Sequence, residues 1–538
     1  MNESKTIEPV VGAAHDGGEG KAVLAAANGN ILDDGLQRGL KRRHLQMIAL
    51  GGVIGPSIWY GTGYALSYSG PVGALICFII VGIDVFFVMQ SLGEICTMYP
   101  TPGAFTEMAG RFLDPALAFA LGWNYWFLWI SNLSNEYNGL SIVLGLWTDK
   151  VPSYGWILLS WGFFQCTALL PVTAYGEMEF WFASWKVLCV FGGFLVAILI
   201  NTGAIGGDYI GFRYWADPGP FVNGISGFAQ TLVLAAVYYC GTEMVAVTAG
   251  ESKSPKRDLP AAIKQSFTRI FVVFIGLLFL ASLIVPSDSP SFLTATSKSG
   301  LSPWTIALVA SGWRAAGNLV NVVILTANLS SINSSIYIAS RTLLSLAKLG
   351  RAPSFFARTT PAGVPVRAVV FSNLLGLLSL MNIGATAGQV FSYFITISGA
   401  ATFIAWAAIG VMHIRFRRAW VAQGRTVGEL PFRALWYPWG AWFVAGINVF
   451  FVLIQGYQTL SPFAAGDFVV AYVVIVLFVV LAVGWKFGKK TRWVQLAEMD
   501  LVSGTREDLP DVTGGGEEEK KKKKKAGILL KTRRFFFA

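Results

Sequence analysis

Several ionisable side chains fall inside apolar stretches of this sequence, where a charge is costly and therefore uncommon; they are Asp84, Glu94, Glu136, Lys186 and Glu243. Glu136 lies among amides that include Asn132 and Asn135, Lys186 stands between a tryptophan and a valine, and Glu243 follows a Gly-Thr pair. In a membrane, such a residue usually faces a cavity or a partner. A low dielectric favours its neutral form, so the group can take up and release a proton as water access changes. These residues are therefore candidates for function, with snorkelling to the nearby helix end as the alternative for Lys186.

Two apolar stretches contain residues that interrupt a helix. Residues 48–63 read IALGGVIGPSIWYGTG, and VYYCGTEMVAVTAG occupies 237–250. In hydrocarbon an interrupted helix survives only where it is buried or lines a cavity, because each backbone polar group needs a partner. Its freed amides and half-helix dipole form a receptor for an anion such as a carboxylate. A glycine-rich packing face is the alternative for the first stretch alone. A second interruption at a corresponding position favours a ligand site.

The composition places these elements in a membrane. Of the 538 residues, 54% are hydrophobic and only 13% are charged, against roughly 25% charged in soluble proteins. Twelve apolar segments are long enough, at roughly 20 residues each, to cross the hydrocarbon core. We therefore predict an all-α integral membrane protein with twelve transmembrane helices, of which helices 1 and 6 are broken. The predicted spans are residues 46–67, 73–98, 115–147, 155–172, 180–200, 225–250, 265–285, 316–346, 368–381, 390–413, 437–457 and 468–485.

The basic residues alternate between loops. If the N-terminus is inside, the loops after the sixth, eighth and tenth spans carry most of the lysines and arginines of the loops. The positive-inside rule then puts both tails in the cytosol, and this placement of the net charge of +11 argues against nucleic acid as a partner. The predicted organisation is a disordered tail over residues 1–40, a transmembrane domain over 41–488 and a C-terminal tail over 489–538.

No group of residues predicts an enzyme. The three histidines lie in the N-terminal tail or at membrane ends, and the five cysteines lie in apolar segments without CxxC spacing. No nucleophile or metal constellation is present in the sequence. We expect no catalytic residue, no metal and no cofactor.

Several ordered stretches together resemble one protein family. They read LKRRHLQMIALGGVIG, VMQSLGEICTMYPTPGAF, GRFLDPALAFALGWNYW, GEMEFWFASWKVL, CGTEMVAVTAGESKSPKRDLPAAIKQSFTRI, NSSIYIASRTLLSLAKLGRAP, HIRFRRAWVAQGRTVGELPF and AEMDLVSGTRE. This set resembles the fungal, yeast-type amino acid permeases of the amino acid, polyamine and organocation superfamily. The resemblance implies that the first ten helices form two inverted five-helix repeats. It also implies amino acid import with protons across the plasma membrane.

The resemblance assigns roles to particular positions. It implies substrate-binding positions in the two interruptions, with the carboxylate at the first and the ammonium near backbone carbonyls of the second: Gly55, Pro56 and Ser57, then Tyr239, Cys240, Gly241 and Thr242. It implies roles in proton coupling or gating for Lys186, Glu136 and Glu243. The expected partners are an amino acid, a proton and the lipid bilayer.

Three departures from the family pattern bear on the substrate. The family usually reads IGTGLFVG where residues 54–61 are IGPSIWYG, so Pro56 removes an N–H and Ser57 must supply that contact. The common LPLE reads LSNE at 133–136, and the phenylalanine gate region reads Tyr238-Tyr239. Two alternatives stay open: an amino acid sensor that keeps the fold, and a transporter of polyamine, choline or GABA. The vacuolar membrane is the alternative location.

Overall fold

The structure is a computed structural model, and it describes residues 44, 47–48, 54–101, 103–249, 251–252, 255–290, 292, 302–313, 315–384, 387–460 and 462–505. Over these residues the chain is mainly helical, and Leu460 and Phe463 form an isolated antiparallel bridge. Within them, seven helices are long and apolar enough to cross a membrane, and two shorter apolar helices cover Phe271–Ile284 and Trp439–Ile454. Gly51 and Gly52 lie outside the described residues.

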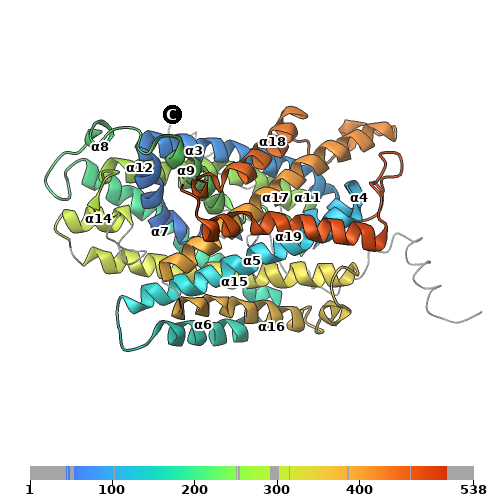
Figure 1. The fold of residues 1–538 in the computed structure, drawn as a ribbon, viewed down its shortest axis with the longest axis horizontal. Coiled ribbons are helices and arrows are strands. Elements are labelled where there is room, and N and C mark those ends of the chain that lie inside the picture. Colours follow the sequence, from blue (N-terminus) through green and yellow to red (C-terminus); the bar gives the residue numbers. More distant parts are fainter. Residues whose placement is uncertain are drawn as a thin grey trace, which may run out of the picture.

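Most of the helices run roughly along the long axis of the molecule (Figure 1). The α-helices are α3 (Ser57–Met98), α4 (Ala104–Phe112), α5 (Pro115–Gly145), α6 (Ser153–Thr167), α7 (Val172–Asn201), α8 (Arg213–Ala216), α9 (Gly224–Tyr239), α10 (Met244–Ala249), α11 (Pro255–Thr268), α12 (Gly276–Ile284), α14 (Pro303–Ala310), α15 (Ala316–Lys348), α16 (Val366–Leu375), α17 (Ala387–Ala422), α18 (Trp439–Ile454) and α19 (Ala465–Lys489). A π-helical segment, η2 (Arg269–Ile275), joins α11 to α12. Short 3-10 segments are η4 (Ser354–Ala357), η5 (Gly376–Ile383), η6 (Val427–Glu429) and η7 (Tyr457–Thr459).

The first two predicted spans appear as one helix, α3, that is broken at Gly70. Gly70 has φ +77°, a conformation that L side chains rarely adopt. A Cβ at this position would lie 2.8 Å from the carbonyl oxygen of Pro220. That carbonyl accepts the N–H of Val72 at 3.1 Å. The glycine therefore allows the chain to end one apolar segment and begin the next against the loop before α9.

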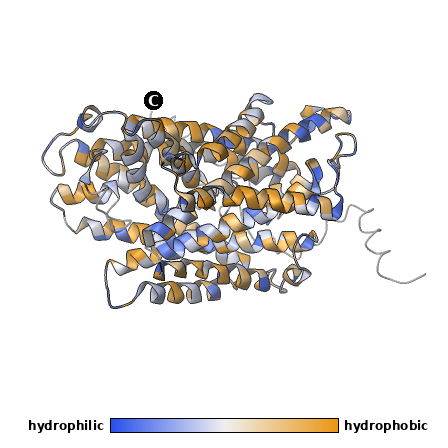
Figure 2. Ribbon diagram, viewed as in Figure 1, coloured by the Kyte–Doolittle hydropathy of each residue, from blue (hydrophilic) through white to orange (hydrophobic). Residues whose placement is uncertain are grey.

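Two long helices, α5 and α15, lie side by side in the middle of the body (Figure 1). They approach closely where α5 has no side chain, since a Cβ on Gly122 would lie 2.4 Å from Leu346. Figure 2 shows hydrophilic residues in this central region, whereas α19 is hydrophobic along much of its length. Only 11% of the most apolar window of α19 is buried within the protein. Hydrophilic residues thus gather in the central helices, and α19 is peripheral.

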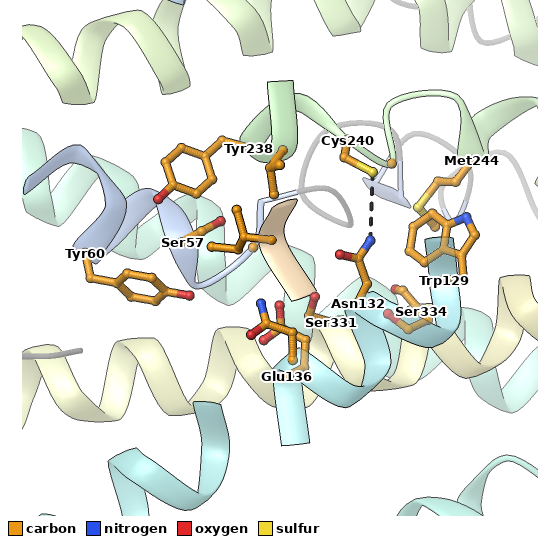
Figure 3. A pocket seen from close by; sticks show the side chains of 16 residues that line it. Ser57, Tyr60, Trp129, Asn132, Glu136, Tyr238, Cys240, Met244, Ser331 and Ser334 are labelled. Atoms are coloured by element: carbon orange, nitrogen blue, oxygen red, sulfur yellow. Dashed lines mark hydrogen bonds between the residues drawn. The ribbon is translucent and has the colours of Figure 1, made fainter. Parts of the chain in front are cut away.

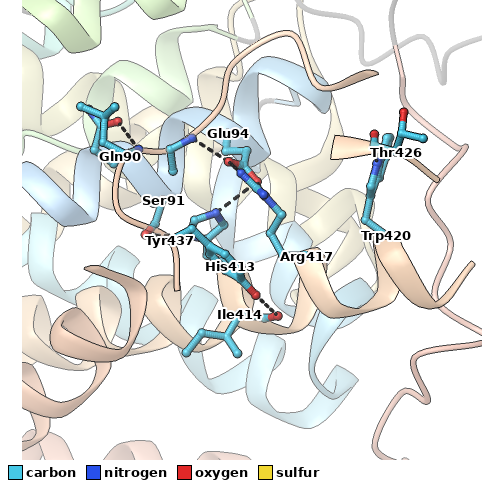
Figure 4. A network of polar contacts seen from close by, with 11 residues as sticks. Gln90, Ser91, Glu94, His413, Ile414, Arg417, Trp420, Thr426 and Tyr437 are labelled. Carbon is cyan, nitrogen blue, oxygen red and sulfur yellow. Dashed lines mark hydrogen bonds and ion pairs between the residues drawn. The ribbon is translucent and has the colours of Figure 1, made fainter. Parts of the chain in front are cut away.

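A buried ion-pair network joins α3 to α17 near the ends that are predicted to face the cytosol (Figure 4). The Glu94 carboxylate accepts hydrogen bonds from the Arg417 guanidinium, with Nη2 at 2.7 Å from Oε2. It lies 3.2 Å from Nε2 of His413, and it also accepts the backbone N–H of Ala434 at 2.7 Å. Because Glu94 is fully buried, these partners are what makes its charge tolerable there.

The segment after α19 folds back against this same end of the bundle. The N–H of Val494 donates to the carbonyl of Leu113 at 2.9 Å, and the Tyr99 hydroxyl donates to the carbonyl of Leu501 at 3.1 Å. The Gln423 amide donates to two further carbonyls of this segment. Residues 491–505, called the strap below, therefore connect the segment between α3 and α5, which contains α4, with the end of α17.

Candidate functional site

The two helix interruptions face the middle of α5 and α15 across one cavity (Figure 3). Its volume is about 60 Å³, several times the roughly 10–15 Å³ that one water needs. From the interruptions it is lined by Gly55, Ser57, Cys240 and Gly241. The remaining lining residues come mainly from α3, α5, α9 and α15: Tyr60, Trp129, Asn132, Asn135, Glu136, Val237, Tyr238, Met244, Ser331, Ser334, Ser335 and Ile395. The cavity is therefore a predominantly polar space inside an apolar bundle.

The first interruption ends where α3 begins. Ile54 and Gly55 are not helical, and Pro56 forms the turn whose carbonyl accepts the N–H of Trp59 at 3.1 Å. Proline is well suited to this position, because its fixed φ matches a helix start and the first helical amides have no partner within the helix. The amide end of α3 thus lies at the cavity wall, where its partial positive charge favours an anion.

The second interruption separates α9 from α10. Cys240 leaves the helical conformation at the end of α9, and Gly241 has φ +87°. Such a φ strongly favours glycine. The Thr242 hydroxyl donates to the carbonyl of Tyr239 at 2.6 Å, which satisfies one of the carbonyls released at the end of α9. The Asn132 amide of α5 reaches across to the Cys240 sulfur at 3.8 Å (Figure 3).

Part of the polar lining has no hydrogen-bond partner among the described residues. Oδ1 of Asn135 and the hydroxyl of Ser335 are buried and have no such partner. The two residues are 8% and 0% exposed, respectively. A buried polar group left unpaired costs about 1–3 kcal/mol. These atoms are therefore positioned to receive water or a polar ligand in the cavity.

Aromatic side chains cover one side of the cavity. Tyr60 and Tyr238 both line it and are almost fully buried. Tyr238 packs directly over Gly61, where a Cβ would lie 1.7 Å from the tyrosine hydroxyl oxygen. Trp59 packs edge-on against Trp304 with ring centroids 5.3 Å apart. Of the bulky residues that follow Ser57, Tyr60 therefore lies at the cavity, and Trp59 packs against Trp304 outside its lining.

Lys186 lies behind the cavity wall rather than in it. The helix that carries it, α7, begins at Val172, fourteen residues earlier and about 21 Å away along the axis. The side chain is 1% exposed, and Nζ donates to the Ser330 hydroxyl at 2.8 Å. The same Nζ is 3.6 Å from Oε1 of Glu179. Snorkelling is therefore the wrong interpretation of Lys186, because its ammonium group points to α15 and not to a membrane surface.

Glu243 is also buried outside the cavity. It is 1% exposed and stands immediately before α10. Its Oε2 accepts the indole N–H of Trp406, in α17, at 3.3 Å, whereas Oε1 has no hydrogen-bond partner among the described residues. Glu243 therefore connects the second interruption to α17.

The structure separates the predicted site residues into two groups. Those that line the cavity are Gly55, Ser57, Cys240, Gly241 and Glu136. Those that lie beside it are Pro56, Tyr239, Thr242, Lys186 and Glu243. Tyr239 faces away, since its hydroxyl donates to the carbonyl of Phe78 at 3.2 Å.

One buried charged residue beside the site was missed by the sequence analysis. Glu179 is 0% exposed and accepts the Ser330 hydroxyl at 2.8 Å through Oε1. The signal for it was available, because Glu179 precedes Lys186 by seven residues. That spacing puts an acid and a base on one helix face, two turns apart.

Comparison with known proteins identifies the family. Residues 44–498 match the family model described as amino acid permease. This chain belongs to the amino acid permease family. The permease is 42% identical over 478 residues to the general amino acid permease AGP3 of Saccharomyces cerevisiae. The aligned region covers 88% of this chain and 86% of AGP3. It is 37% identical to the lysine-specific permease of the same yeast over 486 residues, covering 88% and 80% of the two chains.

Solved structures with a similar fold are known. A manganese transporter from Eremococcus coleocola, crystallised with an aromatic bis-isothiourea compound, superposes with a TM-score of 0.52 and 12% identity. The superposition covers 83% of the permease and 94% of that transporter. At this identity the likeness concerns the fold alone. The family and the apolar helices together make the permease a multi-pass membrane transporter and not an enzyme.

Proposed function

We propose that this permease imports amino acids together with protons, and that the substrate binds in the cavity between the two helix interruptions. One observation carries the proposal: two helix breaks meet at a polar cavity, and a buried lysine lies directly behind its wall. The breaks supply backbone groups of opposite polarity, and the lysine supplies a group that can change its charge. This combination suits a zwitterionic substrate that moves with a proton.

The carboxylate of the substrate is assigned to the start of α3. There, Gly55 and the N–H and hydroxyl of Ser57 stand at the positive end of a helix dipole. The ammonium is assigned to the second interruption, near the backbone of Cys240 and Gly241 and the negative end of α9. Thr242 already occupies the carbonyl of Tyr239, so the neighbouring backbone is the better acceptor.

Proton coupling is assigned to Lys186, Glu136 and Glu243. All three lie within the helical bundle, where the neutral form of an ionisable group competes with the charged one. Glu136 lines the cavity and interacts electrostatically with Lys186. The protonation of these three side chains can therefore respond to substrate that binds in the cavity. Each charge carried across the membrane gains about 2.3 kcal/mol per 100 mV, which supports accumulation.

The topology belongs to the same proposal. Twelve spans, the first ten forming two inverted five-helix repeats, would bring the two interruptions together at the midplane. With both termini in the cytosol, the basic loops obey the positive-inside rule. We assign the permease to the plasma membrane.

The test is uptake into transporter-deficient yeast that expresses the chain. Labelled amino acids, with spermidine, choline and GABA as competing probes, are supplied in acidic and neutral medium, with and without an uncoupler. We expect amino acid uptake that is faster in acid and that the uncoupler abolishes. Uptake of only a competing probe would reassign the substrate. Surface expression without uptake would favour a sensor, and uptake unaffected by pH and uncoupler would refute proton symport.

Lys186→Ala tests the coupling assignment in the same assay. We expect loss of concentrative uptake, because the variant removes the buried ammonium while leaving the cavity lining intact. Trp185, its neighbour on α7, is 41% exposed, so Trp185→Ala is a matched control that should retain uptake. Full concentrative uptake by Lys186→Ala would remove the lysine from the mechanism.

A further inference from the structure

Glu179 is a buried acid for which the cavity provides no role. It does not line the cavity, it is 0% exposed, and it lies two turns along α7 from Lys186. A carboxylate buried in this way is expensive unless it is paired and fully hydrogen-bonded. Here only Oε1 is bonded, and Oε2 has no hydrogen-bond partner among the described residues. Glu179 is thus linked to Lys186 in two ways, directly as an ion pair and indirectly through the Ser330 hydroxyl.

The Ser330 hydroxyl lies between the lysine and this acid. Lys186 Nζ donates to the serine oxygen at 2.8 Å, and the serine in turn donates to Glu179 Oε1 at 2.8 Å. The direct separation of Nζ and Oε1 is longer, at 3.6 Å. Both bonds have the length of good hydrogen bonds. They form a continuous chain from a proton donor, through a hydroxyl, to a proton acceptor.

A second, smaller cavity begins one helical turn beyond Glu179. Tyr175, four residues earlier on α7, lines it together with Asn333, Tyr337, Ser340 and Arg341 of α15. Its volume is about 20 Å³, enough for about one water. The wall of this cavity also includes Thr167 and Leu170, at the turn between α6 and α7. This turn is on the side of the membrane that we assign to the cytosol.

We propose that Glu179 is the proton acceptor of a relay that carries the symported proton from Lys186 towards the cytosol, between α7 and α15. The relay rests on the proposed function, proton symport. In the step, a Lys186 N–H bond breaks as an O–H bond forms on Ser330, while the original Ser330 proton moves to Glu179 Oε1. The products are a neutral amine and a neutral carboxylic acid, so no atom or charge is lost. The acid then releases its proton to water at the second cavity.

Other charged and titratable groups face this chain from the surrounding elements. Glu136 of α5 interacts with Lys186 from the substrate side. Tyr175 interacts with Glu179 from the same helix. On the cytosolic side, Arg341 donates to Oε1 of Glu251 at 2.9 Å and stacks on Tyr337 with 4.1 Å to the ring centroid. The charges of Arg341 and Glu251 largely neutralise each other, so this ion pair adds little net charge beside the second cavity.

The experiment uses the purified full-length permease in liposomes. The probe is the labelled L-amino acid that gives the largest uncoupler-sensitive uptake in the yeast screen. Uphill uptake driven by an imposed pH gradient requires that the proton be released in each cycle. Counterflow, in which labelled substrate exchanges for unlabelled substrate without a gradient, does not. The ratio of the two rates therefore isolates proton release from substrate binding and from folding.

We expect Glu179→Gln to lower uphill uptake by about 10²-fold and to leave counterflow unchanged. Ser330→Ala should behave in the same way, and Ser330→Thr, which retains the hydroxyl, should restore uphill uptake. Glu177→Gln is the matched control, because this acid is on the same helix but is 42% exposed and pairs with His44. Both of its rates should equal those of the unmodified permease.

Uphill uptake at the unmodified rate in Glu179→Gln or in Ser330→Ala would overturn the relay. If Glu179→Gln also loses counterflow, Ser330→Ala decides: lost uphill uptake with retained counterflow supports the relay, and any other pattern refutes it. Failure of the proposed function has a different signature. In that case the unmodified permease itself shows no response to the pH gradient.

Discussion

Tyr238 lines the cavity in its present position only because residue 61 has no side chain. Any Cβ at that position would overlap the tyrosine hydroxyl, and both residues are buried, so neither can move towards solvent. At the scale of the residue, this pair determines how much space the cavity offers. The unpaired Asn135 and Ser335 atoms determine its polarity.

Gly61→Ala should therefore damage the site more than the fold. Overpacking costs about 1–3 kcal/mol, and displacement of Tyr238 into the cavity should weaken apparent substrate affinity by about tenfold. The measurement is the concentration dependence of uptake. Gly192→Ala is the control, because nothing lies within 4 Å of a Cβ there. Equal affinities for the two variants would contradict the packing argument.

Glu243→Gln tests the acid next to the second interruption. Glutamine keeps the size of the side chain and an oxygen for the Trp406 indole, but it cannot ionise. If Glu243 exchanges a proton during transport, uptake should depend less on pH between acidic and neutral medium. Glu498→Gln, a change to an exposed acid of the strap, should keep the original profile. An unaltered profile in Glu243→Gln would exclude it from coupling and gating.

At the scale of the element, a few buried polar contacts fix helices that are otherwise apolar. Glu94 ties α3 to α17 through Arg417 and His413 (Figure 4). Asp84, in the middle of α3, accepts the Asn448 amide of α18 at 2.9 Å and 3.0 Å. Apolar side chains pack as well against lipid as against each other, so such contacts specify which helix faces which.

Removing one partner of the Glu94 network should destabilise the permease strongly. Arg417→Met leaves a fully buried carboxylate without its main partner, and such losses are about 3–5 kcal/mol. Arg418→Met changes the next residue, which is exposed, and should alter stability by only about 0.5 kcal/mol. Unfolding of both variants in detergent micelles measures the difference. Similar losses would mean that the network contributes little.

At the scale of the whole molecule, the strap ties together segments that are far apart in the sequence. Asp114 caps α5 by accepting the N–H of Ala116 at 2.8 Å. It also accepts Lys486 Nζ at 2.5 Å and the Thr491 hydroxyl at 2.7 Å, where α19 leads into the strap. Burial raises the pKa of Asp114, but the hydrogen bonds from Lys486, Ala116 and Thr491 outweigh it and hold the pKa below its usual range.

This lowered pKa makes a stability contribution that acid removes. The contribution is complete above the unfolded pKa, about 3.9, and is lost as the pH falls through the lower folded value. Asp114→Asn keeps a helix-capping residue but loses the charge, and Lys486 is 48% exposed, so we expect a loss of about 1 kcal/mol at neutral pH. Unfolding against pH should also show a shallower decline in acid for this variant. Asp149→Asn, at an exposed acid, should match the unmodified permease, and a decline as steep in Asp114→Asn would contradict the assignment.

Much of the architecture could be predicted from the sequence. The helix interruptions at Gly55 and Gly241 and the placement of Lys186 and Glu243 inside the bundle follow from local composition and chain chemistry, and the structure has them, together with seven helices apolar enough to cross a membrane among the described residues. The segment ends were less predictable. Helix α7 starts at Val172 rather than near residue 180, because the polar residues that precede Trp181 are tolerated once Glu179 is buried against Ser330.

Partners distant in the sequence were decided only by the tertiary structure. Lys186 and Ser330 are 144 positions apart, and Asn448 is 364 positions from Asp84. The sequence of one segment does not indicate which other segment it contacts, because a polar side chain in a helix can bond to any neighbour that packing brings to it. The sequence by itself determined a membrane transporter with two broken helices, since hydrocarbon restricts which backbones can cross it. Which buried charges meet, and which face the cavity, depended on how the helices pack.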